Sequence, residues 1–257
     1  MVEKQSEKAL KMEIYDTNRM PWQVRPTSTD KKVFGQKQLI QDPDVGMESV
    51  LYEYPAGFTT YMHTHPCGHG HFILEGQMKV NQSYYGPGTF IWYPEGCVAE
   101  HGATAFENAK VLMFSNKPFQ VTYCQDEADR EAKEQGIEPI ITDTNRMEWF
   151  YRMASTSGKL FGKKALHQDK DTGMEVNLMR YPAGFTTERH AHPCGQGFYI
   201  IQGQFHSDQD IYGPGTLLWY PEGYVAEHGA TAYEDCICIQ FSNKPQKMLY
   251  ERPEYQK

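Results

Sequence analysis

The segments HTHPCGHGHFILEG (63–76) and HAHPCGQGFYIIQG (190–203) are two versions of one sequence, and they decide the fold of this chain. In the first version, His63 and His65 flank a single residue and precede a Pro-Cys-Gly turn and an apolar run. A β-strand points alternate side chains to one face, so the two imidazoles point the same way. The turn reverses the chain and brings His69 back opposite them. Each segment therefore predicts a hairpin that gathers polar side chains on one face.

The similarity extends along the chain at a constant offset of 127 positions. Five blocks each occur twice, the second time 127 residues after the first: DTNRM, YPAGFTT, YGPGT, VAEHGATA and FSNKP. Such a repeat predicts two copies of one domain. We expect an N-terminal domain at 1–124 and a C-terminal domain at 139–257. The intervening segment, 125–138, is rich in charge and in helix formers, and we expect a helical linker there.

Within each copy the pattern is all-β. Short apolar segments such as SVLYEY (49–54), TFIWYP (89–94) and KVLMFS (110–115) are separated by turns rich in glycine and proline. Strands of four to seven residues with this punctuation are typical of a β-sandwich or β-barrel.

A second repeated block supplies one more imidazole to each copy. It reads Gly-x5-Pro-x-Gly-x4-His and ends at His101 in the first copy and at His228 in the second. Three or four nitrogen or oxygen donors that converge inside a β-barrel predict a metal site. We expect one divalent metal ion per domain. The expected ligands are His63, His65, His69 and His101 in the first copy, and His190, His192, Gln196 and His228 in the second.

Together, the two blocks resemble the two motifs of the cupin superfamily, and their duplication resembles a bicupin. The resemblance implies an all-β chain of two tandem cupin barrels, each a double-stranded β-helix or jelly roll. A closer resemblance is to cupins of the acetylacetone dioxygenase and 2,4'-dihydroxyacetophenone dioxygenase kind, and to the cupin domain of anti-sigma factors. It is carried by DTNRMPW (16–22), KQLIQDPDVGMESVLYEYPAG (37–57), HTHPCGHGHFILEG (63–76) and YYGPGTFIWYP (84–94).

Two departures from the cupin motifs leave alternatives open. The usual motif has a glutamate where this chain has His69 and Gln196. The second motif usually has two residues between its glycine and its histidine, whereas four stand here. Glu100 or Glu227 is therefore an alternative ligand to the histidine that follows it, since adjacent strand residues face opposite sides.

Further residues near the motifs have both a functional and a structural interpretation. Besides His69 and Gln196, we consider His71 a catalytic candidate; it occurs only in the first copy and either lines the pocket as a proton shuttle or caps the strand. Cys67 and Cys194 follow the ligand turn and are either thiolate ligands or inert buried residues, the latter being favoured.

Ligand charge narrows the chemistry. Neutral imidazoles and an amide leave the full +2 charge on the ion, which favours anionic chelating substrates such as an enolate. Together with the resemblance, this favours an iron(II) dioxygenase that cleaves a C–C bond of a small diketone, hydroxyketone or aromatic ketone. Zinc, manganese or nickel would suit a non-redox isomerase, lyase or decarboxylase on a sugar-derived or keto-acid substrate. A metal-binding sensor is the third hypothesis, although anti-sigma cupins accompany a helical domain that this sequence does not show.

Composition excludes other classes. A net charge of −8 over 257 residues, without a basic cluster, argues against nucleic acid as a partner. No apolar run is long enough to span a bilayer, and the first residues lack the apolar core of a secretory signal. Six cysteines are too few for a disulfide scaffold and favour a cytoplasmic location. We expect a small-molecule substrate, no membrane partner, and either a monomer or a homodimer of bicupins.

Overall fold

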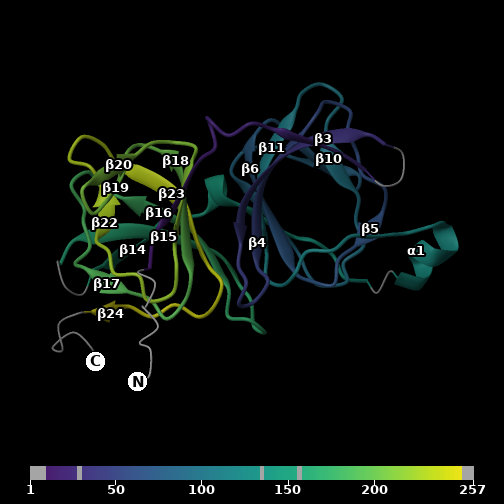
Figure 1. Cartoon of the computed structure of the whole chain (residues 1–257). Coiled ribbons are helices and arrows are strands. Elements are labelled where there is room, and N and C mark those ends of the chain that lie inside the picture. Colours follow the sequence, from purple (N-terminus) through teal and green to yellow (C-terminus); the bar gives the residue numbers. More distant parts are fainter. Residues whose placement is uncertain (1–9, 28–30, 134–135, 155–157, 251–257) are drawn as a thin grey trace, which may run out of the picture. The chain divides into compact units, whose positions relative to one another are not determined.

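The chain divides into two compact units of antiparallel β-structure (Figure 1). The computed structural model describes residues 10–27, 31–133, 136–154 and 158–250. We call one unit the N-unit; it contains residues 17–150 and 164–174. The other, the C-unit, contains the described parts of 1–16, 151–163 and 175–257.

The N-unit is built on a seven-stranded sheet with two smaller sheets beside it. The large sheet consists, in order, of β13 (Ile140–Asp143), β9 (Thr89–Tyr93), β6 (His69–Glu75), β11 (Ala109–Ser115), β4 (Glu48–Tyr54), β3 (Val33–Gln41) and β2 (Gln23–Pro26). A three-stranded sheet contains β10 (His101–Ala103), β7 (Met78–Val80) and β8 (Ser83–Tyr85), and a two-stranded one pairs β12 (Thr122–Tyr123) with β5 (His63–Thr64).

The C-unit repeats this topology. Its large sheet consists of β1 (Glu13–Asp16), β21 (Thr216–Tyr220), β18 (Gln196–Gln202), β23 (Cys236–Ser242), β16 (Glu175–Tyr181), β15 (Leu160–Gln168) and β14 (Phe150–Met153). The smaller sheets are β20 (Asp210–Tyr212) with β19 (Phe205–Ser207) and β22 (His228–Ala230), and β17 (His190–Ala191) with β24 (Leu249–Tyr250). The all-β prediction is thereby confirmed. The expected linker contains the helix α1 (Glu127–Lys133), and its residues 134–135 lie outside the described residues. A single 3-10 turn, η1 (Thr144–Arg146), follows β13.

Strand alternation explains why one face of β6 can carry histidines. His69 and His71 point to one face of the strand, and Gly70 lies between them on the other. A Cβ atom at Gly70 would lie 2.6 Å from the Phe90 ring, so only glycine lets β6 pack this closely. The core of the N-unit contains apolar side chains such as Ile73 and Ile91, both fully buried. Each such side chain contributes about 1.5–3 kcal/mol to stability.

The compact units differ from the two sequence copies by an exchange of edge strands. β1 comes from the first copy but pairs antiparallel with β21 of the C-unit, with Glu13 opposite Trp219. β13 comes from the second copy but pairs with β9 of the N-unit, with Ile140 opposite Trp92. The expected boundaries, 1–124 and 139–257, follow the repeat and not these pairings. An edge strand pairs through backbone hydrogen bonds, which the equivalent strands of both copies can form equally well. The repeat in the sequence therefore could not predict the exchange.

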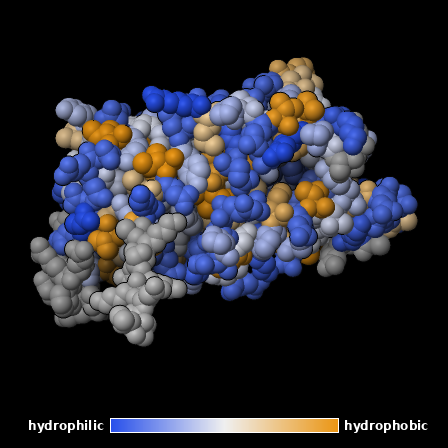
Figure 2. Space-filling model, in the orientation of Figure 1, coloured by the Kyte–Doolittle hydropathy of each residue, from blue (hydrophilic) through white to orange (hydrophobic). Residues whose placement is uncertain are grey.

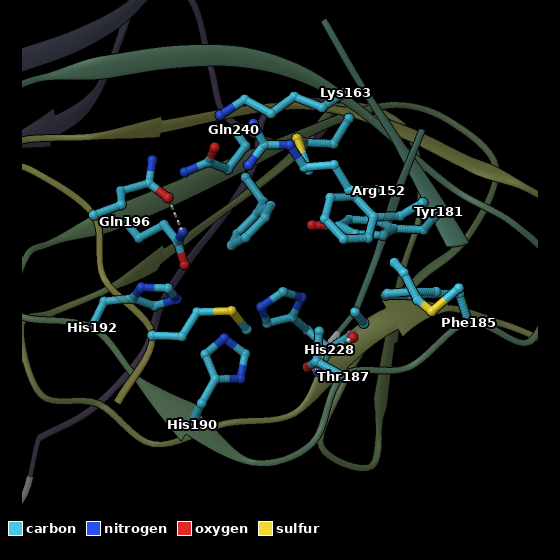
Figure 3. A pocket seen from close by; sticks show the side chains of 17 residues that line it. Arg152, Lys163, Tyr181, Phe185, Thr187, His190, His192, Gln196, His228 and Gln240 are labelled. Carbon is cyan, nitrogen blue, oxygen red and sulfur yellow. Dashed lines mark hydrogen bonds between the residues drawn. The ribbon is translucent and has the colours of Figure 1, made fainter. Parts of the chain in front are cut away.

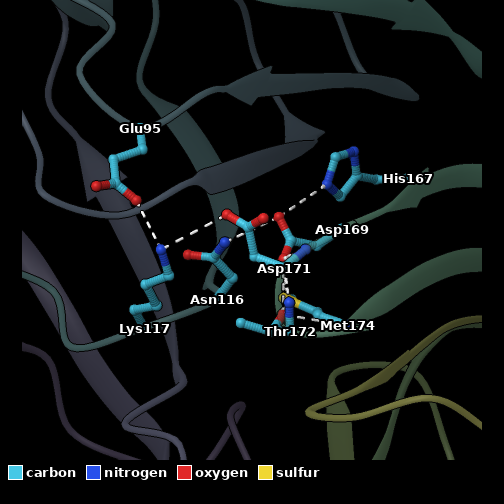
Figure 4. A network of polar contacts seen from close by, with 8 residues as sticks. All are labelled: Glu95, Asn116, Lys117, His167, Asp169, Asp171, Thr172 and Met174. Atoms are coloured by element: carbon cyan, nitrogen blue, oxygen red, sulfur yellow. Dashed lines mark hydrogen bonds and ion pairs between the residues drawn. The ribbon is translucent and has the colours of Figure 1, made fainter.

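A second segment of the later copy, residues 164–174, is also part of the compact N-unit, although 164–168 form the end of β15 in the sheet described for the C-unit. Its contacts there form the polar network of Figure 4, in which Asn116 Nδ2 donates to Asp169 Oδ2 at 2.9 Å. Nearby, the His167 ring stacks on Trp92 with their centroids 3.6 Å apart. Both polar and ring contacts thus tie this segment to the N-unit.

The face of the molecule drawn in Figure 2 is mostly hydrophilic, with separate hydrophobic spots. Among the large apolar side chains of the described residues, the most exposed are Phe106 at 94% and Tyr233 at 87%, which occupy equivalent positions in the two copies. The expected homodimer stays a prediction. Among the described residues, no helix combines the length and the apolar character that crossing a membrane requires.

Candidate metal centre

Five imidazoles form a closed cycle inside the N-unit. The members are His63, His65, His69, His71 and His101, each no more than 6% exposed. Successive ring centroids around the cycle, in the order 63, 65, 69, 71, 101 and back to 63, are 4.9, 4.3, 5.5, 4.9 and 4.9 Å apart. Two groups of three place their ligand atoms within 4.8 Å of one another, namely His63 with His65 and His101, and His69 with His71 and His101. The structure thus brings together all four expected ligands of the first copy and the additional His71.

Backbone carbonyls orient two of these rings. His63 Nδ1 lies 2.7 Å from the Tyr61 carbonyl oxygen, and His65 Nδ1 lies 2.6 Å from that of Gln120. A carbonyl can only accept, so each Nδ1 carries the proton and donates it. Each Nε2 is then left with its lone pair, which is the tautomer that binds a metal ion.

Thr60 holds the backbone of a third histidine, His101, through its hydroxyl group. Its hydroxyl donates to the His101 carbonyl at 3.1 Å and accepts from the His101 amide at 3.0 Å. This paired contact holds β10 in register against the loop before β5, and thereby positions the His101 imidazole. Thr187 makes the same two hydrogen bonds with His228 in the C-unit.

The structure favours His101 over Glu100 as the third donor. Glu100 Oε1 accepts from Lys79 Nζ at 2.7 Å, and both side chains are about a quarter exposed at 27%. His101 is buried on the opposite face of the chain, inside the cycle. Glu227 precedes buried His228 with the same alternation. Neither glutamate belongs to a potential ligand group among the described residues.

The electrostatics of the cycle suit a cation. Burial lowers the pKa of His65 and of His71 to about 3, with neighbouring imidazoles adding to the effect, and it holds the pKa values of His69 and His101 well below their usual range. All are therefore neutral at pH 7. His65 Nε2, both nitrogens of His69, His71 Nδ1 and His101 Nδ1 are buried without a hydrogen-bond partner. Orphaned neutral imidazole nitrogens around one space fit a divalent metal ion.

The cysteines beside the ligand turns do not fit that role. Burial raises the pKa values of Cys67 and Cys194 to about 12, so both thiols remain protonated at neutral pH. A thiol is neither a good metal ligand nor a good nucleophile. Neither belongs to a potential ligand group among the described residues.

The C-unit keeps three imidazoles but not the cycle. The ring centroids of His190 and His192 are 4.9 Å apart, and those of His190 and His228 are 5.1 Å apart. His190 Nδ1 lies 2.7 Å from the Glu188 carbonyl, as its counterpart does in the N-unit. Burial lowers the pKa of His192 to about 4, and the neighbouring His190 adds to the effect. Among the residues described, these donor atoms form no group within 4.8 Å.

Where the N-unit has two further histidines, the C-unit has Gln196 and Phe198. Gln196 Nε2 donates to Gln246 Oε1 at 3.1 Å, and the Phe198 ring lies 4.8 Å from that of His228. A cavity of about 320 Å³ opens above these residues. Figure 3 shows His190, His192 and His228 on one side of it, and Arg152, Lys163 and Gln240 on the other.

Sequence reasoning missed the residues that support the imidazoles. Thr60 lies in YPAGFTT and recurs as Thr187, so a repeated polar residue just before the histidines was a usable signal. The carbonyl of Gln120 carries no signal at all, because any residue supplies a backbone oxygen. For Tyr93, the sequence favours a role in filling the barrel over contact with a ligand; its ring stacks on His69 with centroids 4.7 Å apart, which places it beside the cycle.

Comparison with solved structures identifies the fold. The chain is similar to a protein described as a "putative dioxygenase" from Nostoc punctiforme PCC 73102, with a TM-score of 0.77, 16% identity, and coverage of 97% of this chain and 90% of that one. It is also similar to oxalate decarboxylase from Bacillus subtilis, in a structure at pH 4.6, with a TM-score of 0.61, 12% identity and coverage of 97% and 81%. A third structure, studied for the Mn(II) centres of that decarboxylase, gives a TM-score of 0.63 at 12% identity, with coverage of 94% and 79%.

The chain therefore has an all-β fold of two cupin-like barrels, and its first copy contains a potential metal site. At the level of sequence, no curated protein is significantly similar to the chain. The chain belongs to the family described as a domain of unknown function, DUF4437, whose model matches residues 13–238.

Proposed function

We propose that this bicupin is a metal-dependent enzyme with its ion in the N-unit. His63, His65 and His101 would hold the ion, and His69 would serve as fourth ligand or hydrogen-bonding partner. The observation that carries this proposal is the cycle of five buried, neutral imidazoles whose free nitrogens face one another. The second ion, expected at His190, His192, Gln196 and His228, stays a prediction.

The ligand set supports an anionic substrate. No carboxylate belongs to either group of donors, so the charge of a divalent ion is not reduced by its ligands. An ion bound there supplies Lewis acidity and, as iron(II), one-electron redox chemistry. We favour an iron(II) dioxygenase that cleaves a C–C bond of a small diketone, hydroxyketone or aromatic ketone, because such ketones form chelating enolates.

The chain's own groups would orient that substrate and keep water out. Tyr93 Oη is buried without a partner, and burial holds the pKa of Tyr93 well above its usual range, so it keeps its proton and can donate to a substrate oxygen. The Phe119 ring stacks on His65 with centroids 4.3 Å apart and shields it from solvent. His71, with a pKa of about 3, is a weaker base than proton transfer at neutral pH requires; its free Nδ1 suits a hydrogen bond better.

Elemental analysis followed by oxygen uptake tests the proposal. Protein purified without added metal is analysed, loaded anaerobically with iron(II), and mixed with a β-diketone, an α-hydroxyketone and an aromatic ketone. Oxygen consumption that matches ketone loss supports a dioxygenase. Protein that retains zinc and consumes no oxygen with any of the ketones would exclude it.

A non-redox lyase or decarboxylase is the second candidate. It is supported by Gln196, an amide that would add no charge to a bound ion, so that the ion need only polarise a carbonyl. The fold is shared with oxalate decarboxylase, for which Mn(II) centres are described. Turnover of a keto acid that persists without oxygen, and with manganese in place of iron, would favour this candidate over the first.

A further inference from the structure

We propose that the C-unit cavity binds a small organic carboxylate with an apolar body, and that this binding needs no metal ion. The carboxylate would lie at the end formed by Arg152, Lys163 and Gln240, with the apolar body between that end and the imidazoles (Figure 3). This inference concerns a different unit from the proposed metal centre and does not depend on it.

The cavity has the size and the walls of a small-molecule site. Its volume of about 320 Å³ lies at the lower end of the range for such sites. Its walls include the aromatic rings of Phe161, Tyr181, Phe185 and Phe198. Such walls favour a ligand with an aromatic or aliphatic body, and the small volume limits that body to about one ring.

The charge of the lining selects an anion. Arg152 and Lys163 both line the cavity, and none of its 17 lining residues is acidic. Outside the lining, Glu175 Oε2 lies 3.5 Å from Lys163 Nζ and offsets part of its charge. The guanidinium of Arg152 lines the same cavity, and its planar fork suits a carboxylate.

Two buried amide groups lack acceptors. Asn177 Nδ2 donates to Gln240 Oε1 at 2.8 Å, and Gln196 Nε2 donates to Gln246 Oε1 at 3.1 Å. Each glutamine oxygen is thus occupied, and the nitrogens Gln240 Nε2 and Gln246 Nε2 remain buried without a partner. Gln240 as a whole is only 4% exposed. An orphaned buried donor is unfavourable, and both residues line the cavity, so an oxygen-bearing ligand would satisfy them.

The N-unit lacks most of these donors. At the 127-residue offset, Gln240 corresponds to Met113, Gln246 to Phe119 and Lys163 to Gln36. Only Arg152 keeps its charge, as Arg25. The two copies therefore differ at all three of these donor positions, which points to a ligand that the C-unit alone binds.

The position of the hydrogen-bond donors in the cavity is the reason why we expect the carboxylate to bind without a metal ion. Arg152, Lys163 and Gln240 occupy the side of the cavity opposite the imidazoles (Figure 3). Within the described part of the C-unit, the imidazole nitrogens do not converge as those of the N-unit do. The protein donors alone would then hold the carboxylate.

Calorimetric titration of the full chain tests this inference, with benzoate, phenylacetate and hexanoate as probes and benzyl alcohol as the uncharged comparison. We expect at least one acid to bind with 1:1 stoichiometry, equally well with and without EDTA, and at least tenfold more tightly than benzyl alcohol. Failure of all three acids to bind, equal binding of the alcohol, or loss of binding in EDTA would each overturn it.

Matched variants locate the site. Arg152→Gln and Gln240→Met should each weaken acid binding tenfold or more; methionine already stands at the position equivalent to Gln240, so the second change suits the fold. Arg25→Gln, the counterpart in the N-unit, should leave binding unchanged. Unchanged binding in both C-unit variants, with circular dichroism showing them folded, would contradict the assignment to this cavity.

Discussion

The two copies share a backbone arrangement but use their interior polar groups differently. At one pair of positions on β6 and β18, the N-unit has His69 and His71 where the C-unit has Gln196 and Phe198. The first pair closes a cycle of imidazoles, and the second leaves a cavity lined by amides. These two side-chain differences on one strand face contribute to the contrast between the potential metal centre and the pocket. The comparison teaches that the repeated motif sets the backbone, while the residues between its histidines set the chemistry.

The largest expected difference between the copies is in metal affinity. His65→Ala removes a proposed ligand whose tautomer is fixed by a backbone carbonyl, and we expect a loss in metal affinity on the order of 100-fold or more, since even the groups that support ligands are worth ~10–100-fold. His192→Ala should leave most of the metal in place. Elemental analysis of both purified variants measures the difference. Equal metal loss in the two variants would mean that the copies do not differ as described.

Acid should destabilise the metal-free protein. Burial lowers the pKa values of His65 and His71 to about 3 and of His192 to about 4, whereas an unfolded histidine titrates near ~6.5. As pH falls below that value, the unfolded state takes up protons first. Stability therefore decreases from about pH 6.5 downwards, by up to ~1.4 kcal/mol per pH unit for each such histidine.

Denaturant unfolding of EDTA-treated protein at pH 7, 6 and 5 measures this slope. His71→Phe serves as the control, since phenylalanine occupies the equivalent position of the C-unit, and its slope should be shallower because one buried imidazole is gone. A midpoint that rises on acidification would refute the argument.

A smaller effect is expected from the threonines that hold the third histidine. Thr60→Val removes the two hydrogen bonds to His101 and should lower metal affinity by about tenfold, with a loss of stability of ~1 kcal/mol. Thr187→Val should cost similar stability but change metal content little. Metal titration and thermal unfolding of both variants separate the two effects. A Thr60→Val variant with unchanged affinity would show that the backbone contact does not position the ligand.

The smallest expected effect is a gain of metal binding by the C-unit. The double substitution Gln196→His and Phe198→His gives the C-unit the same strand face as the N-unit, and should raise the affinity of the C-unit for a divalent ion. Metal titration of the variant and of the unchanged protein measures the difference. If the affinity is unchanged while the variant is folded, features beyond these two residues separate the copies.

The sequence predicted much of this arrangement because strand alternation is a local rule. The rings of His63 and His65 lie 4.9 Å apart, although β5 ends at Thr64 and His65 follows it. The alternative to His101 arose from two extra residues in the motif. In the structure, Ala99 forms a β-bridge with His63, and Glu100 accepts a hydrogen bond from Lys79. The longer spacing is therefore accommodated in the segment before His101.

The cycle and the cavity could not be predicted in the same way. Closing the cycle requires three separate strands to meet at set distances, and only a folded chain fixes them. The cavity depends on the difference in volume and polarity between pairs such as Phe119 and Gln246, which lie far from the motifs. The spacing of the histidines in the sequence therefore predicts neither the cycle of imidazoles nor the cavity.

The exchange of β1 and β13 has a consequence for the ancestry of the chain. Each copy supplies one such edge strand, and in this chain that strand pairs with the large sheet of the other unit and not with the β9 or β21 of its own copy. Two separate single-copy chains would complete each other by trading those strands, as swapped dimers do. Gene duplication and fusion would then have preserved an arrangement that began between two molecules. It would also have freed one half to diverge while the other kept its histidines.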